Sequence, residues 1–224
     1  MSDKRIDRAI EKLKRETLAL GALVEEGLFH AFKAYEQRNG SAAEQVIASD
    51  TVIDQREVDL EEECLKTLAL YQPTGQDLRM TVAVMKMTND LERIGDCSVN
   101  IAWQAHSLAY LKPIDAPATM GEMAAKTKTV LRSSLESLVN LDLNAAWGVL
   151  AYDDEIDILN REHKEWVLQQ IRAHPAEAES LLFHLAVSKN LERIADHATN
   201  LAEDVIYMID GDIVRHGRAQ KKVA

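Results

Sequence analysis

The chain has 224 residues, of which 46% are hydrophobic and 28% are charged, and its 26 basic and 37 acidic side chains give a formal net charge of −11. The apolar fraction is too high for a disordered chain, and the length is sufficient for one or two domains with a buried core. The acidic balance argues against a non-specific nucleic-acid binder, because phosphate backbones require a basic surface.

Neither a membrane span nor a secretion signal is predicted. The longest uncharged run, residues 97–111, is short and contains serine, asparagine, glutamine and histidine, which does not suit a bilayer. The first residues lead into a charged amphipathic segment. The two cysteines, Cys64 and Cys97, offer no disulfide framework, which fits a reducing cytoplasm. A basic segment at residues 215–222 is typical of a solvated tail, although it could also contact anionic lipid.

Proline and glycine divide the chain into helical segments. Pro73, Pro113, Pro117 and Pro175 lie at breaks between stretches rich in Ala, Leu, Glu, Lys and Arg, which favour helices. We expect six helices, at about residues 4–38, 41–70, 75–111, 119–140, 144–173 and 175–210. Helices of about 30 residues are about 45 Å long and suit antiparallel bundles.

The sequence contains an internal duplication. Residues 90–96 (DLERIGD) recur as residues 190–196 (NLERIAD), and residues 50–54 have a weaker counterpart at residues 153–157. Repetition in the same order indicates two related units. We therefore predict an all-α fold of two tandem related three-helix bundles, residues 1–112 and 119–224, joined near residues 112–118.

Carboxylates recur on matched helix faces of the two repeats. At about 100° per residue, each pair or triplet shares one face of its helix, away from the apolar side. The carboxylates are Asp50, Asp54 and Glu57 on the second helix, Glu92 and Asp96 on the third, Asp153 and Asp157 on the fifth, and Glu192 and Asp196 on the sixth. A single such motif is typical of a solvated surface. Its retention in both repeats, while much of the rest has diverged, favours a shared task.

Metal binding is the task that best suits these residues. Oxygen ligands from neighbouring helices hold hard cations in bundles, and crowded carboxylates repel one another without a cation. An oxygen ligand set favours Mg, Mn, Ca or Fe over a structural zinc site, although zinc stays among the candidate ions. His197 could add a nitrogen ligand, but its counterpart is Cys97, and a hydrogen-bonded surface histidine is the more common case.

The sequence offers no catalytic group. None of the seven histidines follows a Glu by three positions, as di-iron bundles require, and no phosphate-binding loop or nucleophile elbow appears. We expect a non-enzymatic protein. The alternatives are a metal-storage or metal-dependent helical-bundle enzyme and a plain helical scaffold.

The segments Leu91-Glu92-Arg93-Ile94-Gly95-Asp96 and LERIADHATNLAE (residues 191–203) resemble the PhoU family of phosphate-transport regulators, and the resemblance covers almost the whole chain. It implies a cytoplasmic, often homodimeric protein that attaches peripherally to the membrane through a phosphate ABC transporter and a phosphate-sensing histidine kinase. Such a protein restrains uptake and the starvation response when phosphate is plentiful. The resemblance also implies two metal sites, formed by the nine carboxylates named above.

The two repeats differ beside the carboxylates. Trp103 stands where the second repeat has Glu203, and Asn160 stands where the first has Glu57. The two sites could therefore differ in metal or affinity, and one could be only a protein-contact surface. Trp103, Trp147 and Trp166 are expected to be packing anchors.

Overall fold

The computed structural model describes residues 4–214, apart from the side chain of Asp153, so the basic segment at residues 215–222 lies outside it. The regular secondary structure of the described residues is entirely helical. The helices are α1 (Lys4–Glu36), α2 (Gly40–Tyr71), α3 (Gly75–Ala109), α4 (Ala118–Asn140), α5 (Leu143–Val149), α6 (Asp153–Ala173), the short 3-10 helix η1 (Pro175–Glu177) and α7 (Ala178–Asp210). The predicted all-α fold is confirmed.

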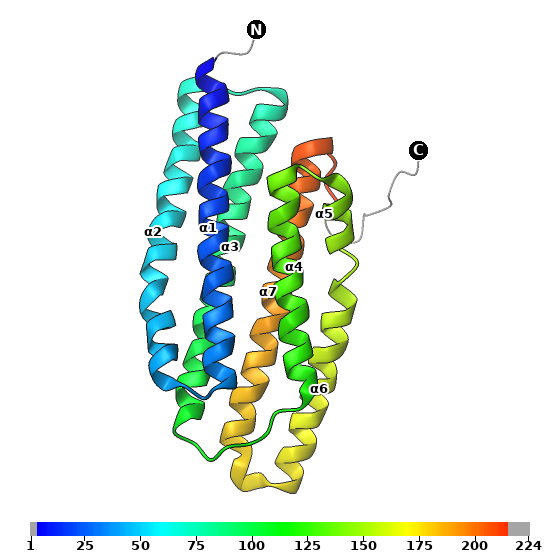
Figure 1. The fold of residues 1–224 in the computed structure, drawn as a ribbon. Helices are drawn as coiled ribbons and strands as arrows, with labels where there is room; N and C mark the ends of the chain where they lie inside the picture. The colour runs from blue at the N-terminus through cyan, green and yellow to red at the C-terminus, as the bar shows by residue number, and fades with distance from the viewer. Residues whose placement is uncertain (1–3, 215–224) are drawn as a thin grey trace.

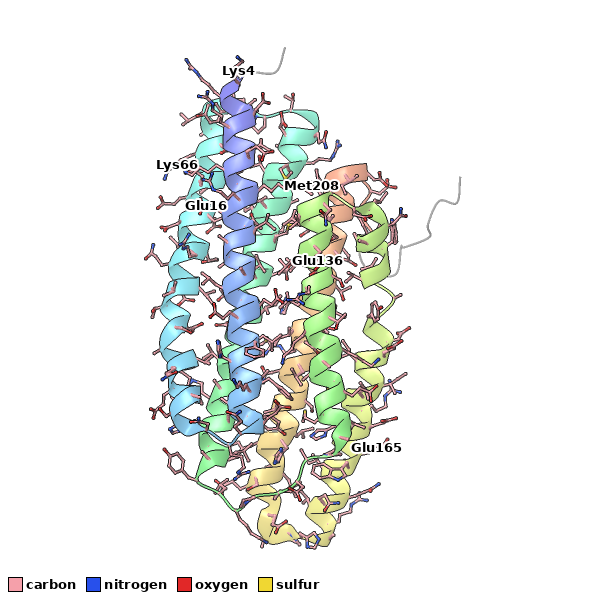
Figure 2. The ribbon with its side chains drawn as sticks, viewed as in Figure 1. Lys4, Glu16, Lys66, Glu136, Glu165 and Met208 are labelled. Carbon is pink, nitrogen blue, oxygen red and sulfur yellow. The ribbon has the colours of Figure 1, made fainter. Side chains whose placement is uncertain are left out.

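The helices are arranged as two bundles side by side. Helices α1, α2 and α3 pack against one another, and α4 packs with α5, α6 and α7 (Figure 1). The connecting segment between α3 and α4 crosses at the end of the molecule away from the N-terminus (Figure 1). Charged side chains such as Lys66 and Glu165 project from the outer helices α2 and α6 (Figure 2). No described helix combines the length and the apolar character needed to cross a bilayer.

The two bundles meet mainly along α3 and α7, with α1 against α4 as a second contact. The repeated motif explains why: Leu91 and Ile94 on α3 and their counterparts Leu191 and Ile194 on α7 are fully buried. The α1–α4 contact is close, because a Cβ placed on Gly21 would lie 2.6 Å from Leu135 Cδ2. The duplicated helices therefore form the centre of the molecule.

The expected helix over residues 144–173 is in fact two helices, and this part of the prediction was wrong. The chain leaves α5 after Val149 and uses tighter i→i+3 bonds, from Ala151 N to Gly148 O and from Tyr152 N to Val149 O. Gly148 weakens the helix just before the break. The carboxylates of Asp154 and Glu155 favour a new start, since they lie in the first turn of α6, near the positive end of its dipole.

Candidate functional site

The carboxylates of the first repeat lie on two helices that approach each other closely. A Cβ placed on Gly95 of α3 would lie 3.2 Å from both Cδ1 and Cγ2 of Ile53 on α2, so the absence of a side chain lets the helices meet. Ile53 precedes Asp54, and Gly95 precedes Asp96. The close contact therefore lies directly beneath the two rows of carboxylates.

These carboxylates affect one another electrostatically. Burial raises the pKa of Asp50 above its ordinary value, and the nearby charges of Asp54 and Asp96 raise it further. The pKa of Glu92 is also raised, first by burial and then by Asp96, although Arg93 acts in the opposite direction. Because Asp96 lies on α3 and acts on Asp50 of α2, the two rows face a common space.

Burial also raises the pKa of Glu57, and its neighbours Glu61 and Asp54 add to the effect. Arg93 relieves this crowding only in part, because its contacts are long: Nε lies 3.6 Å from Glu92 Oε2, and Nη1 lies 3.8 Å from Asp96 Oδ2. Within the described residues, the buried Oδ1 of Asp50 has no hydrogen-bond partner. A hard cation would suit this environment, since it would neutralise the carboxylates and give that oxygen a partner.

The second repeat brings its carboxylates into a tighter group. One oxygen each from Asp157 on α6 and from Glu192 and Asp196 on α7 lie within 4.8 Å of one another. Glu192 is half-buried, and the other two side chains are exposed. Asp153 begins α6, one turn before Asp157, but its side chain lies outside the described part of the structure. Three of the four predicted residues thus converge on a space where one cation could contact all of them.

His197 is engaged elsewhere. Its Nδ1 lies 2.8 Å from Oδ1 of Asp90 on α3, and the same carboxylate oxygen accepts a hydrogen bond of 3.2 Å from Nδ2 of Asn200. This network joins the two repeats across the α3–α7 contact. In the other half, Asn190 stands in place of Asp90 and donates to the backbone oxygen of Ala186. Asp90 was not predicted as a site residue. The signal in the sequence is that the two repeats differ at both members of the pair, with Asp90 against Asn190 and Cys97 against His197.

Replacement of Asp90 by asparagine is expected to destabilise the protein by about 1–3 kcal/mol, because the mostly buried carboxylate loses its charge-assisted bond to His197. Chemical denaturation monitored by circular dichroism measures this effect. The matched control is the same replacement at Asp115, which is exposed in the segment between α3 and α4. An unchanged midpoint for Asp90→Asn would show that the network does not hold the repeats together.

The tryptophans divide into two groups. Trp147 packs against the core, and Trp166 stacks on the ring of His163 with centroids 5.3 Å apart, as packing anchors would. Trp103 is half exposed on α3, so its prediction as a packing anchor was wrong.

Comparison with known proteins identifies the family. The PhoU domain family matches residues 17–105 and again residues 120–205, so each repeat is one copy of the domain. The chain belongs to the PhoU family. A phosphate-specific transport system accessory protein PhoU homolog from Aquifex aeolicus is 34% identical over 96% of this chain and 97% of its own length. PhoU homolog 1 from Thermotoga maritima is 32% identical over 92% of this chain and 89% of its own length.

Solved PhoU structures have the same fold. The crystal structure of PhoU from Pseudomonas aeruginosa superposes with a TM-score of 0.89 at 29% identity and covers 92% of this chain and 99% of that one. The PhoU regulatory protein of the phosphate transport system from Streptococcus pneumoniae gives a TM-score of 0.86 at 26% identity, covering 94% of this chain and 100% of that one. The two-bundle arrangement is therefore the PhoU fold over nearly the whole chain.

Proposed function

We propose that this protein is a non-enzymatic regulator of phosphate homeostasis, which restrains a phosphate-specific ABC transporter and keeps the phosphate-starvation response off when phosphate is plentiful. The observation that carries the proposal is the match of both repeats to the PhoU domain, together with similarity to accessory proteins of phosphate-specific transport over most of the chain. Its partners would be the transporter ATPase and the phosphate-sensing histidine kinase, contacted in the cytoplasm by a homodimer.

The carboxylate groups would serve this function as cation sites. Asp157, Glu192 and Asp196 would hold one ion, with Asp153 as the fourth ligand predicted from the sequence, and the five carboxylates of the first repeat would hold another. An oxygen ligand set suits Mg²⁺, Mn²⁺ or iron, with Zn²⁺ less favoured. A bound cation would neutralise the crowded carboxylates and fix the spacing of the paired helices. The surface presented to a partner would then depend on occupancy.

The deciding experiment is a phosphate-starvation reporter in a strain that lacks the gene. Wild-type protein is expected to restore repression in high phosphate. A variant with Glu92→Gln, Asp96→Asn, Glu192→Gln and Asp196→Asn is expected to lose most of it, because these amides keep the side-chain shape but remove the charge a cation requires. Glu122→Gln, a carboxylate on the exterior of α4, is the control. Full repression by the fourfold variant would show that the carboxylates are not needed, and an unchanged reporter on deletion would refute the regulatory role itself.

The alternative of a metal-storage or metal-dependent helical-bundle enzyme rests on the converging carboxylates of the second repeat. Metal analysis of protein purified without added salts distinguishes this alternative from the proposed regulator. An exchangeable Mg²⁺ or Mn²⁺ fits the regulator, whereas a stoichiometric iron pair that consumes oxygen would favour the enzyme.

A further inference from the structure

Two large aromatic side chains lie exposed on the outer face of α3. Trp103 is 50% exposed and Tyr110, the residue that follows α3, is 75% exposed. At about 100° per residue, both lie on the same side of the axis as Glu92 and Asp96. From Glu92 to Tyr110 this face extends over roughly 27 Å at 1.5 Å per residue. The carboxylate row of the first repeat therefore continues into an aromatic one.

The aromatic rings hold one another in place. The ring of His106 lies between them, with its centroid 6.3 Å from that of Trp103 and 5.2 Å from that of Tyr110, in edge-on contact with both. His106 Nε2 lies 3.2 Å from Oε1 of Glu44 on α2, which ties the group to the neighbouring helix. We call Trp103, His106 and Tyr110 the aromatic row. Exposed aromatic side chains that are already ordered lose little freedom on binding, and such residues often dominate protein contacts.

The second repeat shows that the fold does not require this row. One hundred residues later, Glu203 stands in place of Trp103 and Asp210 in place of Tyr110. The same helix in the same kind of bundle thus accepts acidic side chains at both positions. The packing of the helix therefore does not require aromatic side chains at these two positions, and burial of apolar surface does not account for them.

We propose that the α2–α3 face of the first repeat, when its carboxylates hold no cation, docks a basic amphipathic segment of a protein partner, through the aromatic row and the carboxylates beside it. This inference rests on the proposed function, in which the protein acts through protein contacts, and specifies the surface and the chemistry of the partner. The face is strongly acidic: Glu44, Asp54 and Asp96 lie along it, with Arg93 as a basic side chain that pairs with Glu92 and Asp96.

Arginine is the side chain that can bind both the aromatic row and the carboxylates of this surface. A guanidinium group stacks over aromatic rings and also makes paired hydrogen bonds to carboxylates. A helical segment of about 18 residues would cover the length from Glu92 to Tyr110. An anionic membrane is the less suitable occupant, because its phosphates would be repelled by the same carboxylates.

The test replaces the aromatic residues by those of the second repeat. A fluorescein-labelled synthetic helical peptide of 18 residues, with arginine on one face and leucine on the other, is titrated with the full chain in the presence of chelator, and binding is followed by anisotropy. The double variant Trp103→Glu, Tyr110→Asp is expected to bind about 10-fold more weakly or worse. Simple charge attraction predicts the opposite, because this variant is more acidic than the wild type. Leu182→Glu, which adds a charge at an exposed position of α7, is the control and is expected to bind like the wild type.

Three results would overturn the proposal: equal wild-type binding to a peptide with glutamate in place of arginine, equal or tighter peptide binding by the double variant, or binding to phosphatidylglycerol vesicles that depends on Trp103. Both substituted side chains are exposed, so thermal unfolding of the double variant is expected to match the wild type. If the double variant unfolds at a lower temperature than the wild type, peptide binding by Trp103→Ala alone gives a second measurement. Because the readout is peptide binding, a negative result leaves the reporter test of the proposed function unaffected.

Discussion

Acidification from pH 7 to pH 5 is expected to lower the free energy of unfolding by about 2 kcal/mol for each of two buried histidines. His163 on α6 is 1% exposed and His184 on α7 is 3% exposed. Burial lowers the pKa of both from the ordinary value of 6.5 to about 4, and the proximity of His163 adds to the effect on His184.

The free energy of unfolding falls on acidification because the unfolded chain takes up protons that the folded protein does not. Each histidine stays neutral in the folded protein down to about pH 4, whereas the unfolded chain binds a proton below about pH 6.5. Stability from these groups is therefore complete above pH 6.5 and is lost as the pH falls towards 4. His184 Nδ1 lies 2.5 Å from the hydroxyl of Tyr35 on α1, so the loss would also loosen a contact between the repeats.

His163→Phe isolates this effect. Within the described residues His163 interacts with the backbone of His184, but neither ring nitrogen makes a hydrogen bond of normal geometry. Phenylalanine therefore keeps the stack on Trp166 and removes the titrating group with little loss of polar contact. We expect the variant to be at least as stable as the wild type at pH 7 and to lose about 2 kcal/mol less between pH 7 and pH 5. Denaturant unfolding at a series of pH values measures this, with the exposed His174→Gln as control. Parallel curves for His163→Phe and wild type would rule out His163 as the source.

A divalent cation is expected to stabilise the wild-type protein by about 2.7 kcal/mol at a free concentration one hundred times its dissociation constant. For a chain of this size that corresponds to a rise in Tm of about 5–10 °C. In the first repeat we expect this stabilisation to come from binding of the cation to carboxylates whose pKa values are raised by burial and mutual repulsion. A raised pKa means that their ionisation opposes folding as the pH rises, so at pH 7 without a cation they destabilise the fold.

Glu92→Gln should therefore raise the Tm of the cation-free protein and reduce the rise in Tm that a cation produces. With chelator the variant is expected to melt above the wild type, because one of the repelling charges is gone. With 10 mM Mn²⁺ its gain in Tm is expected to be smaller than that of the wild type, because one ligand charge is lost. Differential scanning calorimetry measures both values, and Glu122→Gln should behave like the wild type. An equal gain for Glu92→Gln and wild type would exclude Glu92 from cation binding.

Much of the fold could be predicted because its signals are local. Pro73, Pro113 and Pro175 mark the breaks between helices, and the repeated motif at residues 90–96 and 190–196 identifies the pair of helices at the centre. The break between α5 and α6 was missed, because residues 144–173 carry a continuous helical pattern and the chain turns there without proline. Gly148 and the acidic residues that follow Tyr152 were the available signals, each too common in helices to be decisive.

The site could be predicted in part. Spacing along one helix places Glu192 and Asp196 on one face, but only the packing of α6 against α7 brings Asp157 to them. The partner of His197 could not be predicted, because Asp90 lies 107 positions earlier and the pairing depends on how α3 and α7 cross. The exposure of Trp103 was missed for a related reason: its side chain stays 50% exposed once the helices have packed, whereas composition suggests burial for any tryptophan.

The pairing of His197 with Asp90 also shows how two repeats that began as identical copies can come to differ at the contact between them. If two copies of the first repeat associated in this manner, the thiol of Cys97 would face the carboxylate of Asp90. If two copies of the second repeat did so, the imidazole of His197 would face the amide of Asn190. Only the mixed arrangement gives an imidazole facing a carboxylate. This pair therefore favours the association of the two different halves, and self-association of either half would forfeit the contact between His197 and Asp90.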